Sequence, residues 1–170
     1  YVITFKKTLV FSALLFILGI VIFITEPWYR DLQINNMPIA IANYMTKTNK
    51  SVFTILPWFG YVAFGGFLAT IFYRYLERNT FKKTIIIGLF ITGFLLINYS
   101  TSFLYFINRI TDIEVIKLSA GYNYLFKRLG DMFILFALFY TLEDYLKHSL
   151  ILKIGQKTLS IYVIHFIIIY

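Results

Sequence analysis

The stretch Thr84-Ile-Ile-Ile-Gly-Leu-Phe-Ile-Thr-Gly-Phe-Leu-Leu-Ile-Asn-Tyr-Ser-Thr-Ser-Phe-Leu-Tyr-Phe-Ile107 contains no charged side chain. As an α-helix it would be about 36 Å long, which exceeds the roughly 30 Å hydrocarbon core of a bilayer. Backbone polar groups in lipid must be satisfied inside helices or a closed barrel. The stretch therefore predicts a membrane-spanning helix over residues 84–107.

Similar apolar runs lie on both sides of this stretch. Two precede it, over 8–25 and 53–75, and two follow it, over 128–146 and 158–170. The last run is only about 20 Å of helix, too short to cross a bilayer. We therefore expect the final span to be truncated and the chain to be a C-terminal fragment of a larger protein. The predicted fold is all-α, a polytopic transmembrane helical bundle of about five spans in which residues 1–170 form one membrane-embedded domain.

The composition supports the same class of protein. Hydrophobic residues make up 59% of the chain and charged residues 14%, with a mean hydropathy of +0.75. Soluble domains are less apolar and more highly charged. The net charge of +8 comes from Lys and Arg clusters beside the apolar runs, which favours contact with lipid headgroups and not with nucleic acid. Cysteine is absent, which excludes disulfides and thiolate chemistry.

Small residues in the run over 53–75 indicate close helix packing. They are Gly60, Ala63, Gly65, Gly66 and Ala69, and small side chains let membrane helices approach one another. Two further local predictions come from the stretch after residue 107. A short helix capped by Thr111 or Asp112 can precede Gly121, and Arg128 can pair with Asp131 on one helix face.

A polar run interrupts the span over 84–107 at Asn98-Tyr-Ser-Thr-Ser102. Five hydrogen-bonding side chains facing lipid would be costly. Two interpretations remain open, because these side chains can line an aqueous cavity or can hydrogen-bond between helices and to their own backbone. Under the first interpretation, Asn98, Ser100 and Ser102 are candidates to contact a substrate.

The final run carries an ionisable residue, His165, within an apolar stretch. Thr158, Tyr162 and His165 fall on one face of a helix, which we expect to point into the bundle. In one interpretation His165 and Tyr162 fix helix packing by hydrogen bonds. In the other they line a cavity, where a histidine with a near-neutral pKa can bind a polar ligand or move a proton. His165 is the sole candidate catalytic residue, and the sequence does not assign it that role.

Motifs of soluble enzymes are missing. The chain has no phosphate-binding glycine loop, no nucleophile elbow and no metal-binding His-Glu-x-x-His, so no metal site is predicted. The densest basic segment holds Arg74, Arg78, Lys82 and Lys83. Such a segment attracts anionic lipid headgroups.

Three short motifs resemble a known family. They are Asn43-Tyr44 followed by Ser51-x-Phe53-x-x-x-Pro57-Trp58-x-Gly60-Tyr61 with Gly65; Arg128-Leu129-Gly130; and Gly155 with Leu159-Ser160-x-Tyr162-x-x-His165. Together they resemble the heparan-alpha-glucosaminide N-acetyltransferase-like group, which is related to the broader acyltransferase-3 type. These motifs touch most of the chain from Asn43 onward.

The resemblance implies transfer of an acyl group, usually acetyl, from acyl-CoA to a hydroxyl or amine of a sugar or glycolipid. It implies acetyl-CoA as co-substrate without a bound cofactor, and a location in the bacterial inner membrane. Under this resemblance the basic segment can meet the phosphates of coenzyme A if it is cytoplasmic, whereas attraction to the membrane surface is the alternative explanation of its charge. In such proteins the chemistry is attributed to a histidine in an early span near arginines, and this chain has neither feature, so that role is not carried over to His165. Two alternatives remain, a transporter or flippase fragment with a polar-lined path and a non-catalytic structural subunit. The sequence does not indicate an oligomeric state.

Overall fold

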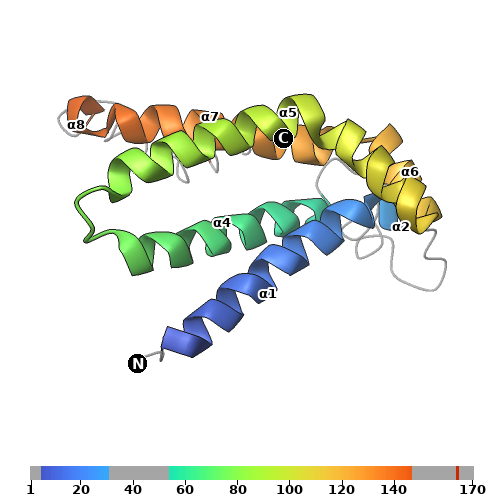
Figure 1. Ribbon diagram of the computed structural model, residues 1–170, viewed down its shortest axis with the longest axis horizontal. Helices are drawn as coiled ribbons and strands as arrows, with labels where there is room; N and C mark the ends of the chain where they lie inside the picture. The colour runs from blue at the N-terminus through green and yellow to red at the C-terminus, as the bar shows by residue number, and fades with distance from the viewer. Residues whose placement is uncertain (1–4, 31–53, 147–163, 165–170) are drawn as a thin grey trace.

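The computed structural model describes residues 5–30, 54–146 and 164 of the chain. These residues form helices and no strand, which confirms the predicted all-α class. Figure 1 shows the helices in chain order. They are α1 (Phe5–Ile24), α2 (Glu26–Arg30), α4 (Ile55–Tyr75), α5 (Phe81–Thr111), α6 (Glu114–Gly121), α7 (Tyr124–Thr141) and α8 (Glu143–Leu146).

Three of the described helices are long and apolar enough to cross a membrane. They cover Lys7–Ile24, Ile55–Tyr75 and Phe81–Thr111, and they match the predicted spans over 8–25, 53–75 and 84–107. The protein is therefore an integral membrane protein. Helix α5 continues past the predicted end at 107 because the backbone stays helical until Asp112, whose φ of 51° is left-handed. The Asp112 N–H donates to the carbonyl of Asn108 at 2.7 Å and closes the last turn.

Helix α7 differs from the predicted span over 128–146. It begins four residues earlier, at Tyr124, and ends at Thr141, and its first half carries Lys127, Arg128 and Asp131. Because of these charged residues, α7 is not among the helices that are apolar enough to cross a membrane. The predicted pairing of Arg128 with Asp131 is wrong, because both side chains are exposed and no ion pair joins them in the described part of the chain. The predicted span over 158–170 lies outside the described residues, apart from Ile164.

The helices form two antiparallel pairs, α1 with α4 and α5 with α7 (Figure 1). The pairs diverge toward the turn between α4 and α5, and they are joined at the opposite end by α2 and α6. Rings link the pairs at both ends. Phe23 of α1 contacts Phe126 of α7 with ring centroids 5.3 Å apart, and Phe72 of α4 contacts Tyr140 of α7 at 5.4 Å.

Glycines set how closely the helices in each pair approach. On α5 and α7, a Cβ at Gly93 would lie 2.7 Å from the carbonyl oxygen of Gly130, and the reverse distance is also 2.7 Å. On α1 and α4, a Cβ at Gly60 would lie 2.5 Å from the ring of Phe23. The prediction that Gly60 permits close packing is thus confirmed, whereas Gly65 has open space beside it because it faces a cavity.

Helix α6 occupies the place predicted for a short helix before Gly121. The predicted cap is wrong. Thr111 belongs to α5 and donates its hydroxyl to the carbonyl of Ile107, and α6 begins after Ile113 without a side-chain cap. The buried face of α6, at Val115, Ile116 and Ala120, packs on Leu104 of α5. Because Ile24 at the end of α1 packs on the same cluster, α6 holds the two helix pairs together.

Candidate functional site

A buried carboxylate lies where the two helix pairs meet. Glu26 opens α2 and is only 3% exposed. The Tyr124 hydroxyl donates to its Oε1 at 3.1 Å, and the Arg30 guanidinium donates to its Oε2 at 3.5 Å. Burial and the charge of Glu26 raise the pKa of Tyr124 above its usual value, so its hydroxyl stays protonated and remains a donor. Both oxygens of the carboxylate are therefore partnered.

Aromatic side chains surround this ion pair. The Arg30 guanidinium stacks over the ring of Tyr122, 4.1 Å from its centroid. The Tyr29 hydroxyl donates to the carbonyl of Ile22 at 3.0 Å, and the Tyr61 hydroxyl donates to the carbonyl of Leu125 at 3.2 Å. These hydrogen bonds connect α2 to α1 and α4 to α7, so the polar cluster fixes the junction of the pairs.

Asn123 connects this junction to the middle of α5. It precedes α7 at the N-cap position but makes no capping hydrogen bond. Its Nδ2 instead donates to the hydroxyls of Ser100 at 2.7 Å and Thr101 at 3.0 Å. Asn123 is 8% exposed, and its Oδ1 is buried without a hydrogen-bond partner among the described residues. Rotating the side-chain amide of Asn123 by 180° would exchange Oδ1 and Nδ2, and one of these two atoms would still lack a hydrogen-bond partner among the described residues.

Replacing Asn123 should therefore destabilise the bundle. We expect Asn123→Ala to lower the free energy of unfolding by about 1–2 kcal/mol, since two partly buried hydrogen bonds are lost. Asn98→Ala is the matched control, because Asn98 is exposed and donates only to the carbonyl of Phe94 in its own helix. Unfolding with increasing SDS in mixed micelles gives the measurement. Equal losses for both variants would contradict a special role for the Asn123 bridge.

The polar run on α5 divides between two faces of the helix. Ser100 is 7% exposed and faces α7 through Asn123. Asn98 and Ser102 are exposed, so they do not lie beside Ser100 in one site. Of these candidates, Ser100 lines the larger of the two cavities described below.

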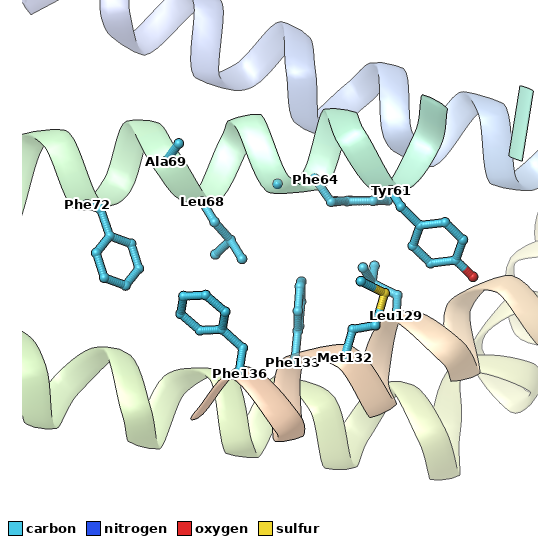
Figure 2. Close-up of a pocket in the computed structure, with 10 residues that line it drawn as sticks. Tyr61, Phe64, Leu68, Ala69, Phe72, Leu129, Met132, Phe133 and Phe136 are labelled. Carbon is cyan, nitrogen blue, oxygen red and sulfur yellow. The ribbon is translucent and has the colours of Figure 1, made fainter. Parts of the chain in front are cut away.

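A small cavity of about 440 Å³ separates α4 from α7. Figure 2 shows its lining side chains pointing toward one another from the two helices, with the Tyr61 hydroxyl at one end. Helix α4 contributes Tyr61, Leu68 and Phe72, and α7 contributes Met132 and Phe136. Apart from the Tyr61 hydroxyl these side chains are apolar, and they offer no group for acid–base chemistry.

A larger cavity of about 740 Å³ lies among all four long helices. Its walls are apolar apart from Thr92, Tyr99 and Ser100 on α5. The space is only partly enclosed, so it is open to the surroundings of the bundle.

The predicted basic segment lies at the far end of the bundle, around the turn between α4 and α5. Arg74 and Arg78 approach the Tyr75 ring, with their guanidinium carbons 5.3 and 4.8 Å from its centroid. Lys83 is exposed, whereas Lys82 pairs with Glu143 at 3.2 Å and with Asp144 at 3.1 Å. Acidic residues of α8 thus offset part of the positive charge that the sequence places here.

The structure does not bring the predicted site residues together. Lys83 and Ser100 are seventeen residues apart on one helix, about 26 Å along its axis. The basic segment at the start of α5 and the Ser100 cluster near the middle of α5 are therefore far apart. Tyr162 and His165 fall outside the described residues, and of their neighbours only Ile164 is described, with 56% exposure.

Sequence reasoning missed two polar residues of the junction, Glu26 and Asn123. Glu26 stands beside Pro27, a pattern typical of a helix end in water, and nothing local indicates that α7 will cover it. Asn123 precedes an apolar helix and looks like a helix cap. In each case the signal in the sequence was one polar residue beside an apolar run. Such a residue does not indicate which distant side chain it will contact.

Comparison with protein families identifies one match. Residues 1–110 match the family model described as heparan-alpha-glucosaminide N-acetyltransferase, catalytic. The matched range contains α1 and α4 and reaches almost to the end of α5, so it covers the three apolar spans. It includes the motif from Asn43 to Gly65, but neither Arg128-Leu129-Gly130 nor the motif ending at His165.

Searches of curated proteins and of solved structures give no match to the chain. The family model covers well over half of the 170 residues, and its range coincides with the membrane-spanning helices that organise the fold. The chain belongs to the heparan-alpha-glucosaminide N-acetyltransferase catalytic family, and is an integral membrane protein with an acyltransferase-like role.

Proposed function

We propose that this protein takes part in moving an acetyl group from acetyl-CoA to a hydroxyl or amine of a sugar or glycolipid, in the bacterial inner membrane. The observation that carries the proposal is the family match over residues 1–110, which coincides with the three apolar spans. In this reaction the acceptor oxygen or nitrogen attacks the thioester carbonyl. The carbon–sulfur bond breaks, coenzyme A leaves as its thiolate, and a general base takes the acceptor proton.

The acyl donor would bind at the basic end of the bundle. Arg78 and Lys83 are the exposed cations there that suit its phosphates, because Arg74 is half-buried and Lys82 is held by Glu143 and Asp144. His165 is the candidate base that the sequence offers, with Tyr162 three positions before it, and both lie outside the described residues. Glu26 is a weaker candidate for the base, since both of its oxygens already accept hydrogen bonds.

The assay is release of the coenzyme A thiol in membranes that contain the protein, with and without an amino-sugar acceptor. Membranes from cells that lack the protein give the background rate. We expect thiol release that depends on both the protein and the acceptor, together with acetylated acceptor in equal amount. Absence of acetyl transfer to free sugars and to lipid-linked sugars alike would overturn the proposal.

Variants at the basic end test donor binding separately from chemistry. We expect Arg78→Ala with Lys83→Ala to raise the KM for acetyl-CoA about tenfold, because two charge-assisted contacts to phosphate are lost, and to leave kcat nearly unchanged. Lys117→Ala with Lys127→Ala is the matched control, since it removes two exposed cations from the opposite end. Equal effects of the two double variants would indicate general attraction of the membrane surface, not a donor site.

A further inference from the structure

The larger cavity follows α5 for most of its length. Its lining positions on α5 recur every three or four residues from Ile85 to Ile107, a distance of about 33 Å along the helix. This length matches the roughly 30 Å hydrocarbon core of a bilayer. Dividing the cavity volume of about 740 Å³ by this length gives a mean cross-section of about 22 Å². We call this long, narrow space the α5 groove.

The width and the walls of the α5 groove restrict what can occupy it. A helix is about 10–12 Å across with its side chains, too wide for this cross-section. Water is disfavoured, since apolar cavities of protein interiors stay dry. A single hydrocarbon chain fits, because its carbons can contact the walls at about 3.5–4.0 Å. The walls that would touch such a chain are leucine, isoleucine and phenylalanine side chains from all four long helices.

Ser100 lies inside the α5 groove, about 10 Å along the helix from the last lining position on α5, Ile107. Its side chain is hydrogen-bonded to that of Asn123 at 2.7 Å. The groove therefore offers a ligand mainly apolar contacts.

We propose that the α5 groove binds one hydrocarbon chain of a membrane lipid, held by contact with its leucine, isoleucine and phenylalanine walls. The chain would lie along α5 and separate the α1–α4 pair from the α5–α7 pair. This is a binding site apart from the proposed acetyl transfer, and it stands or falls independently of that activity.

Photo-labelling in nanodiscs tests the proposal. The full chain is reconstituted in phosphatidylethanolamine and phosphatidylglycerol, with part of the phospholipid carrying a diazirine midway along one acyl chain. We expect labels on the groove-facing residues of α5, such as Leu89 and Leu96. Labels restricted to outward residues of the same helix, such as Phe90, Ile91 and Phe94, which are all more than half exposed, would overturn it.

Two glycines provide matched variants for this experiment. Gly88 lines the α5 groove, Gly65 lines only the smaller cavity, and a Cβ at either position meets nothing within 4 Å. We expect Gly88→Leu to block the groove and reduce labelling of Leu89 and Leu96 at least fivefold, whereas Gly65→Leu should leave it unchanged. Thr92→Leu adds a smaller volume to the groove than Gly88→Leu does. It replaces Gly88→Leu in the experiment if that variant does not fold. Unchanged labelling in both groove variants would contradict the proposal.

A cysteine pair separates the lipid from the last segment of the chain as the occupant of the groove. The chain has no cysteine, so introduced pairs can be read without background. A disulfide between Gly88→Cys and Ile164→Cys would place the last segment of the chain against the groove and overturn the lipid assignment.

Discussion

Glu26→Ala is expected to lower the free energy of unfolding by about 3 kcal/mol, the largest single effect among these substitutions. The substitution removes a carboxylate that is 3% exposed and takes one acceptor from Arg30 and one from the Tyr124 hydroxyl. Removing one partner of a buried ion pair is strongly destabilising. Since Tyr124 begins α7 and Glu26 follows α1, the loss should appear as separation of the two helix pairs.

The exposed pair at the other end of the bundle is the control. Glu143→Ala removes one partner of Lys82, but Lys82 and Glu143 are 36% and 41% exposed and Asp144 remains to bind Lys82. Surface ion pairs contribute between zero and about 1 kcal/mol. Unfolding with SDS should therefore separate the two variants clearly. If Glu26→Ala unfolded at the same SDS fraction as Glu143→Ala, the junction cluster would not hold the pairs together.

Gly130→Leu is expected to destabilise the protein by about 2–3 kcal/mol through a different mechanism. A Cβ at Gly130 would lie 2.7 Å from the carbonyl oxygen of Gly93, and backbone cannot move aside as a side chain can. The α5–α7 pair must then separate, which loses packing along its whole length. Gly93→Leu should have an effect of similar size, because the contact is reciprocal.

Gly88→Ala is the matched control for the glycine crossing. It adds a methyl group to the same helix as Gly93, but at a position where nothing lies within 4 Å. We expect no loss, or a gain of up to about 1 kcal/mol from the higher helix propensity of alanine. Thermal unfolding in detergent, followed by circular dichroism, compares the three variants. A Gly130→Leu protein as stable as Gly88→Ala would show that the helices do not cross at these glycines.

The sequence by itself determined the class of the protein and the positions of its three apolar spans. Long apolar runs are a local property, and in lipid the backbone has few ways to satisfy its hydrogen bonds other than a helix. The family resemblance at Asn43 to Gly65 was also readable, since it depends on residue order alone, and the family match confirms it. The small residues Gly60 and Gly66 indicated close packing, and both lie against side chains of α1.

The tertiary structure alone decided which polar residues meet. Ser100 faces Asn123 while Asn98 and Ser102 face outward, because the helical turn separates residues that are adjacent in sequence. Glu26 is buried because α7 begins with Tyr124 directly above it, and Lys82 is neutralised by residues about sixty positions away. Such pairings depend on how helices pack over long sequence separations. The spacing of apolar residues in a single helix specifies which face is buried but not which neighbour covers it.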